Sequence, residues 1–214
     1  MSPRRTPLII AAIAIAYPLL LRRPILTWGA TREEATAALA GDGLIGAPDR
    51  VSTRAISIAA PAAAVWPWIV QIGPAPRAGA YTYDWIENLL GLDMHSADRV
   101  IEEFQRPQLG ERIALGSNEM VVAVLEPERA FGWRSDDGNW LWTFTLQPTE
   151  EGTRLISRNS FRLPTIGLRI GMVPMEAGSL FMELKMLAGI KRRAEALHGG
   201  GIAPRDPSEH ARRC

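Results

Sequence analysis

The stretch Met175–Gly200, MEAGSLFMELKMLAGIKRRAEALHGG, decides the fold because it predicts a long amphipathic helix near the end of the chain. Basic residues at 191–193 suit the C-terminal end of a helix, and the glycines that follow His198 end it. Such a helix needs an apolar surface to cover. Apolar side chains return on one of its faces at helical spacing, namely Leu180, Leu184, Leu187, Ala188, Ala194 and Leu197.

Short β-prone runs before this helix supply the surface. The turn sequences GSNE, EPER, DDGN and TEEG separate them, and runs joined by tight turns indicate an antiparallel meander. An alternating Ile-rich run from Thr53 adds another strand. We therefore predict an α+β fold in which a curved antiparallel sheet wraps around the C-terminal helix. The meander strands are expected at 111–115, 120–126, 130–135, 140–148 and 153–161.

Three shorter helices are expected earlier in the chain. Thr31 with Glu34 has the pattern of a capping box, for a helix that runs through Leu39. Pro61 opens the helical run PAAAVWPWIVQIG, which Pro67 should bend or split. The third is a short helix over residues 84–90.

Composition excludes several classes of function. The chain has 214 residues, the size of one domain with an appendage, and a net charge of +1, so no strong field attracts nucleic acid. Cys214 is the only cysteine, which leaves no disulfide framework. His95 has no second histidine nearby, and no phosphate- or dinucleotide-binding glycine motif occurs. We expect no metal, no cofactor and a monomer.

The uncharged run from Pro7 to Leu21, PLIIAAIAIAYPLLL, is flanked by arginine pairs on both sides. It is short for a bilayer core of about 30 Å, unless the flanking arginines reach the headgroups. We favour an uncleaved single-pass membrane anchor through residues 7–21. A signal peptide and a helix buried against the domain are the alternatives. Arginines on both flanks leave the side of the membrane open.

Four motifs of this chain resemble sequences of the SRPBCC superfamily, the group that includes START lipid-transfer domains and polyketide cyclases. They are APAAAVWPWIVQIG, RAGAYTYDWIENLLG, ADRVIEEFQRPQLGE and FMELKMLAGIKRRAE, and the likeness extends from about Trp28 to Leu197. The resemblance implies the helix-grip fold and a hydrophobic pocket. It leaves the use of the pocket open, because the superfamily contains carriers, cyclases, hydrolases and interaction modules.

The resemblance and the composition together divide the chain into three parts. Residues 1–30 are expected to form the hydrophobic anchor helix and a linker. Residues 31–198 are expected to form a ligand-binding domain. The polar residues 199–214 lack an apolar period and are expected to be disordered.

The polar aromatic stretch after the Pro/Gly-rich loop is the candidate pocket rim. Tyr81 and Tyr83 lie two residues apart, so in an extended segment they face the same side. They could close the pocket mouth, or be half-buried rings whose hydroxyls reach water. Asp84 could be an acid–base group, but a carboxylate at a helix N-terminus is also favoured by the helix dipole.

Further candidates come from the helices and the strands. Trp66, Trp140 and Trp142 would line a pocket for a large apolar ligand, or belong to the core. Gln71 could hydrogen-bond a ligand or cap a helix end. Lys191 lies near the apolar face of the last helix, on which Leu184 sits. This lysine either extends to solvent or reaches an anionic ligand head or Glu87.

The favoured function is a membrane-anchored, non-catalytic binder or carrier of a lipid or another hydrophobic small molecule. The first alternative is a polyketide-cyclase-like enzyme that uses the Tyr and Asp groups at the rim. The second is a protein-interaction module.

Overall fold

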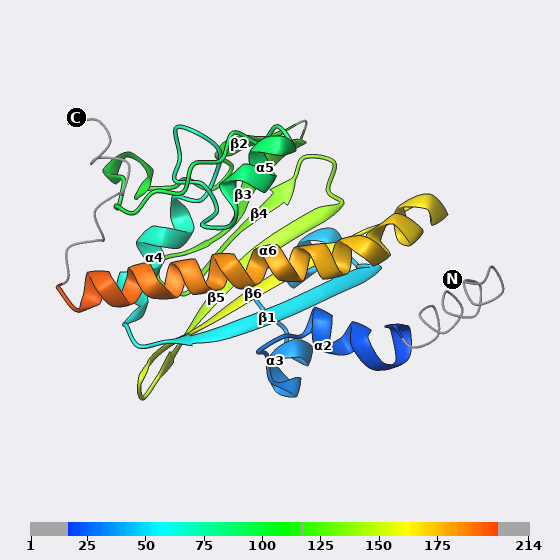
Figure 1. Cartoon of the computed structure of the whole chain (residues 1–214), viewed down its shortest axis with the longest axis horizontal. Helices are drawn as coiled ribbons and strands as arrows, with labels where there is room; N and C mark the ends of the chain where they lie inside the picture. The colour runs from blue at the N-terminus through cyan, green and yellow to red at the C-terminus, as the bar shows by residue number, and fades with distance from the viewer. Residues whose placement is uncertain (1–16, 117, 201–214) are drawn as a thin grey trace, which may run out of the picture.

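The computed structural model describes residues 17–116 and 118–200. Its centre is an antiparallel sheet of six strands in the order β1-β6-β5-β4-β3-β2, so the predicted meander is confirmed and the first strand pairs with the last (Figure 1). The strands are β1 Arg50–Ile58, β2 Arg112–Leu115, β3 Asn118–Glu126, β4 Ala130–Ser135, β5 Trp140–Thr149 and β6 Gly152–Phe161.

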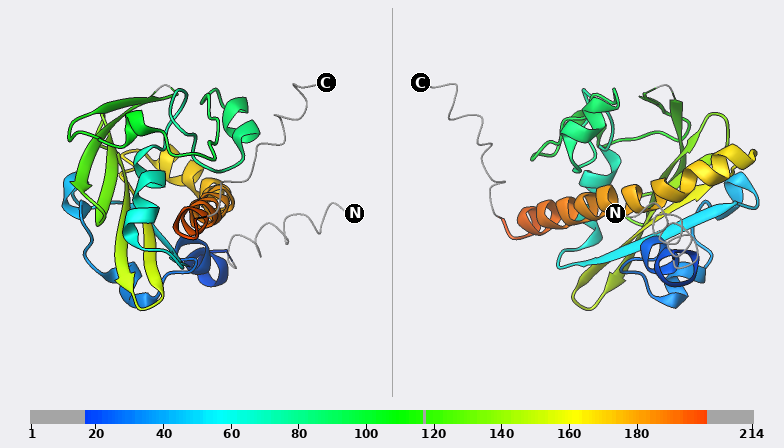
Figure 2. Two further views of the ribbon diagram at one scale, coloured as in Figure 1. Left: turned by 90° about the vertical axis from the view of Figure 1, so that its left-hand side faces the viewer. Right: turned by 45° about the vertical axis from the view of Figure 1, so that its right-hand side comes forward.

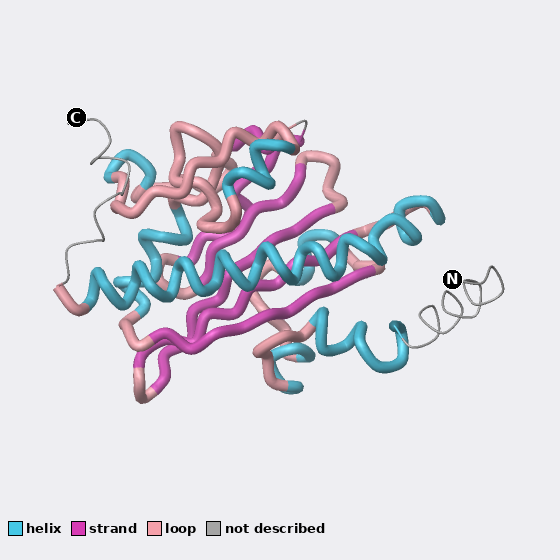
Figure 3. The backbone as a smooth tube through the Cα atoms, viewed as in Figure 1, coloured by secondary structure: helices cyan, strands magenta, loops and turns pink. Residues whose placement is uncertain are grey.

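The long helix α6, Ile166–His198, crosses one face of this sheet, and the sheet curves around it (Figures 2 and 3). The prediction placed the helix start at Met175, which is too late. Thr165 caps the N-terminus by accepting a hydrogen bond from Leu168 N at 3.3 Å. Pro174 lies inside the helix on an exposed stretch, where water can satisfy the carbonyl that a proline leaves unpaired.

The buried face of α6 also differs from the predicted one. Of the predicted residues, Leu187 and Ala194 are buried, whereas Ala188 and Leu197 are exposed. The charged side chains of Glu183 and Arg193 take part in the buried face, because each has an oppositely charged partner from another element. The buried face of this part of the helix consists of Glu183, Met186, Leu187, Gly189, Ile190, Arg193 and Ala194.

The short helices agree with the sequence in position and differ in detail. Helix α4, Ala62–Val70, continues through Pro67 as one helix, because its buried side chains hold it against α6 and the sheet. Helix α5 covers Asp84–Leu89. The capping box of Thr31 and Glu34 is confirmed, but α3 is only Arg32–Thr36. The remaining short helical segments are η1 Tyr17–Leu21, α2 Arg22–Leu26, η2 Asp42–Ile45 and η3 Glu102–Phe104.

The segment before residue 31, predicted as anchor and linker, is attached to the domain where it is described. Arg54 donates to Ile25 O at 3.2 Å, and Ala55 N donates to Trp28 O at 3.1 Å. None of the described helices combines the length and the apolar character needed to cross a membrane. Most of the predicted anchor and most of the predicted tail, residues 1–16 and 201–214, lie outside the described residues.

Candidate ligand-binding site

Three adjoining cavities lie in a row: the outer and central ones between the sheet and α6, and the inner one between the sheet and the loops that precede β2. The inner cavity, of about 30 Å³, shares Met94, Leu115 and Trp142 with the central cavity, of about 200 Å³. The central cavity shares Trp140, Asn159 and Ser179 with the outer cavity, of about 300 Å³. The space under α6 is therefore elongated. Its outer end lies between the N-terminal half of α6, Leu26 and the first residues of β1.

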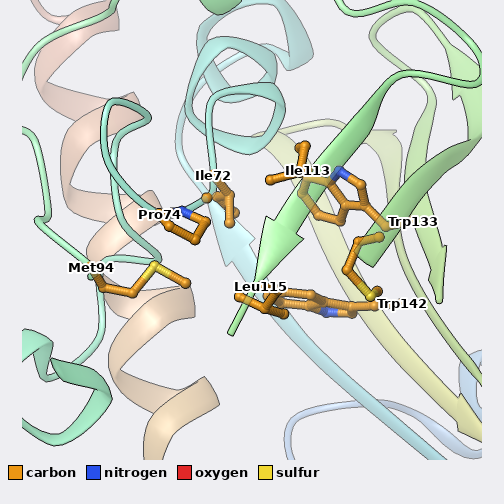
Figure 4. Close-up of a pocket in the computed structure, with 9 residues that line it drawn as sticks. Ile72, Pro74, Met94, Ile113, Leu115, Trp133 and Trp142 are labelled. Atoms are coloured by element: carbon orange, nitrogen blue, oxygen red, sulfur yellow. The ribbon is translucent and has the colours of Figure 1, made fainter. Parts of the chain in front are cut away.

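The inner cavity is the apolar end of this row. Figure 4 shows side chains from two sides closing on it, Ile72, Pro74 and Met94 from loops and others from strands β2, β3, β4 and β5. The labelled strand residues are Ile113, Leu115, Trp133 and Trp142.

Trp140 and Trp142 form a flat aromatic wall on β5. Their rings stack at 6.1 Å with 13° between planes, and Phe161 continues the stack at 5.7 Å from Trp140. The indole N–H of Trp140 donates to Asn159 Oδ1 at 2.9 Å, and that of Trp142 donates to Ser157 Oγ at 3.1 Å. Because these polar atoms are satisfied within the sheet, neither indole needs a hydrogen-bond partner from a ligand. The structure thus brings both predicted tryptophans to the cavities.

Two carboxylates, Glu87 of α5 and Glu183 of α6, line the central cavity. Glu87 is 7% exposed and Glu183 is 6% exposed. Burial raises the pKa of Glu87, and the negative charge of Asp84 raises it further. Burial also raises the pKa of Glu183, against the opposing charge of Arg54. Among the described residues, Glu87 Oε2 and Glu183 Oε1 have no hydrogen-bond partner.

Arg54 of β1 forms a buried ion pair with Glu183, from Nη1 to Oε2. The Arg54 side chain is fully buried, and its other donors reach Ile25 O and, at 3.1 Å, Ser179 Oγ. The guanidinium is therefore held by protein groups on each side. One carboxylate oxygen of Glu183 remains for the cavity.

Tyr81 and Gln71 do not line the three cavities, because they bind one another in the core. Gln71 Nε2 donates to the Tyr81 hydroxyl at 2.9 Å, and Ile101 N donates to Gln71 Oε1 at 2.9 Å. The guanidinium of Arg193 lies 4.5 Å from the Tyr81 ring centre. Burial raises the pKa of Tyr81 well above its usual value. Gly189 permits the close approach of Tyr81 to α6, since a Cβ at position 189 would lie 2.9 Å from Tyr81.

Tyr83 and Asp84 also lie away from the three cavities. Tyr81 has a positive φ of 59°, which breaks the extended alternation, so the two tyrosines do not share a side as predicted. The Tyr83 ring stacks on Phe181 of α6 at 4.7 Å. Asp84 accepts hydrogen bonds from Ser96 N at 2.7 Å and Ser96 Oγ at 2.5 Å. The pocket-rim interpretation of these residues is therefore not supported by their positions.

The remaining predicted residues have structural contacts. Trp66 packs edge-on against Phe131, with ring centres 5.9 Å apart. Leu184 is half-buried on α6. Lys191 Nζ donates to Ser57 O at 2.9 Å and lies 3.5 Å from Glu195, so it does not reach Glu87. None of these three lines one of the three cavities.

Sequence reasoning missed several cavity residues. The available signal for Glu183 was its spacing from Met186 and Leu187, which puts a carboxylate on the buried face of α6. Within the part of the chain that the structure describes, no group of three His, Cys, Asp or Glu side chains is placed to hold a metal ion. The missed cavity residues are Arg50, Asn159, Ser179, Met182, Glu183 and Met186.

No protein-family model and no curated protein matches the chain. Among solved structures, it is similar to the polyketide-cyclase-like protein of Corynebacterium glutamicum, with 22% identity, a TM-score of 0.44, and coverage of 68% of this chain and 91% of that one. A Mesorhizobium loti protein is 19% identical, with a TM-score of 0.43 and coverage of 67% of this chain and 98% of that one. The AHSA1-like protein of Aeromonas hydrophila is 15% identical, with a TM-score of 0.34 and coverage of 66% of this chain and 95% of that one. By its strand order, antiparallel pairing and long C-terminal helix, this chain has a helix-grip fold, in which a curved antiparallel sheet surrounds the last helix.

Proposed function

We propose that this protein binds a lipid or another elongated hydrophobic small molecule in the three adjoining cavities, two of which lie under α6. The observation that carries the proposal is the central cavity, whose wall of Trp140 and Trp142 continues into both neighbouring cavities. Removal of apolar ligand surface from water at this wall contributes about 25 cal/mol per Å². A largely apolar pocket with a few polar groups is the usual form of a small-molecule site.

Binding without chemical conversion is the function that the geometry favours over the cyclase alternative. That alternative needs Tyr81, Tyr83 or Asp84 beside the ligand. The Tyr81 hydroxyl is held in the core by Gln71, and both carboxylate oxygens of Asp84 are occupied by Ser96. A general acid or base must reach the proton it moves, and these groups do not border the cavities.

Native mass spectrometry of gently purified full-length protein tests this function. We expect a bound apolar molecule at one copy per chain, chemically unchanged after long incubation with the protein. Free protein under all purification conditions, together with failure to take up any added apolar compound, would instead favour an interaction module. Conversion of the bound molecule would favour an enzyme.

We also propose that the protein binds its ligand at a membrane. The first turns of α6 reach beyond the ends of the strands (Figure 1) and carry exposed apolar side chains. The outer cavity, lined by Leu26, Met172 and Met175, lies beside these turns. Residues 7–21, uncharged in sequence, lead into the same region, where Tyr17 donates to Glu176 at 2.7 Å. The exposed residues are Ile166, Leu168, Ile170, Val173 and Met175, with Leu20 and Leu21 of η1.

Flotation with phosphatidylcholine vesicles tests the membrane proposal. The full chain is expected to float with the vesicles and to stay bound in high salt, because apolar burial is not screened. The double variant Ile10→Arg/Ile13→Arg should lose most of this binding, since each arginine costs roughly 2.5–3.5 kcal/mol in the centre of an apolar segment. The matched control Leu89→Arg/Leu109→Arg places the same changes on exposed leucines and should float normally. Equal flotation of both variants would contradict the anchor.

A further inference from the structure

The ionisable groups that line the central cavity are all acidic. Its ionisable lining residues are Glu87 and Glu183, and no Lys, Arg or His is among the residues that line it. Arg54 lies behind Glu183 and balances one of the two negative charges. Asp84, at the start of the same helix as Glu87, adds to the negative potential there. The cavity therefore has one more negative charge than positive when both carboxylates are ionised.

The two carboxylates also have unused hydrogen-bonding capacity. Both side chains are more than nine-tenths buried and line the cavity. Glu87 Oε2 and Glu183 Oε1 have no partner with hydrogen-bond geometry among the described residues, although the hydroxyls of Thr82 and Ser157 lie near enough to oppose the rise in the pKa of the two carboxyls. A buried carboxylate oxygen without a donor is costly, and a ligand in the cavity can supply that donor.

The aromatic wall faces the same cavity as these carboxylates. Trp140 and Trp142 both line it, and their indole N–H groups are already used within the sheet. The face of an indole ring attracts a cation, most strongly where water is excluded. Two acidic groups and two indole rings that line one cavity form a set that suits a positively charged group on an otherwise apolar molecule.

We propose that the ligand is a cationic amphiphile, whose basic nitrogen lies in the central cavity against Glu87 and Glu183 while its apolar chain follows the adjoining cavities. This inference rests on the proposed function, since it names the class of ligand for the same site. The nitrogen supplies donors to the two free carboxylate oxygens. Its positive charge also balances Glu87, because Arg54 forms its ion pair with Glu183.

The test compares decylamine, decanol and decanoate by isothermal titration calorimetry on the full chain at pH 7, below the micellar concentrations of the two ionic compounds and below the solubility limit of decanol. The three compounds share one chain and differ in the head group. We expect decylamine to bind at least tenfold more tightly than decanol, and decanoate to bind most weakly. Glu87→Gln should weaken decylamine binding by about tenfold or more, the loss of a hydrogen bond to a charged group, and so reduce the preference for decylamine over decanol.

The control variant is Glu151→Gln, which makes the same change of charge at an exposed position in the turn between β5 and β6. It should leave the affinities for all three compounds unchanged. Equal binding of decylamine and decanol, or tighter binding of decanoate, would overturn the cationic ligand while leaving the apolar binding function intact. The same holds if Glu87→Gln leaves the preference unaltered. If none of the three compounds binds, the proposed function itself fails.

Discussion

Replacement of Arg54 by methionine is expected to lower the free energy of unfolding by about 3–5 kcal/mol, because it strands a buried carboxylate. The Arg54 side chain is fully buried, and its ion pair with Glu183 joins β1 to the middle of α6. The change also removes the donors to Ile25 O and Ser179 Oγ. Urea unfolding followed by circular dichroism measures the loss as a shift of the midpoint.

The double variant Arg54→Met/Glu183→Met is the control for this experiment. It removes both charges together and fills the space with apolar side chains, so most of the lost stability should return. If the double variant is as unstable as Arg54→Met, the loss comes from the contacts of Arg54 with Ile25 and Ser179 and not from an unpaired Glu183. A single variant as stable as the natural protein would contradict the buried pair altogether.

Most of the fold could be predicted from the sequence, because its signals are local. The turn sequences DDGN and TEEG lie between strands that pair directly, and the Thr31–Glu34 capping box marks a helix start within four residues. The start of α6 was missed because Pro174 suggests a boundary, although an exposed carbonyl tolerates it.

Residues of the candidate site were predicted correctly only where their positions follow from the alternation of side chains along a regular strand. Trp140 and Trp142 alternate along one strand and reach the cavity as expected. Tyr81 and Tyr83 fail the same argument, because the positive φ of Tyr81 turns the chain between them. Glu183 was missed as a cavity residue despite its spacing from Met186 and Leu187, because its partner Arg54 is 129 residues away in sequence. From sequence alone, a charged side chain is expected to be exposed to solvent unless an oppositely charged partner is known.

Filling the central cavity is expected to weaken apolar ligand binding by about a hundredfold. Met182 is half-buried and lines this cavity, and its side chain makes none of the polar contacts there. In Met182→Trp the larger indole would occupy the space of three or four ligand methylenes. Each contributes about 0.8 kcal/mol when buried, which amounts to roughly a hundredfold in affinity. The fold should persist, because the new ring enters an existing cavity.

Leu197→Trp provides the matched control for this change. It adds the same side chain to the same helix, at an exposed position that borders none of the three cavities. Any general effect of an extra tryptophan on stability or on non-specific adsorption of ligand should therefore appear in both variants. Thermal unfolding of both proteins checks that they remain folded before binding is compared.

Calorimetric titration of decanol into the full chain and these two variants, at several temperatures, tests the central claim most directly. The cavities predict saturable binding of one molecule per chain in the natural protein and in Leu197→Trp. They also predict a negative heat-capacity change, which marks the burial of apolar surface. In Met182→Trp the affinity should fall by about a hundredfold. Equal affinity in all three proteins, or no saturable binding in any of them, would contradict a ligand site under α6.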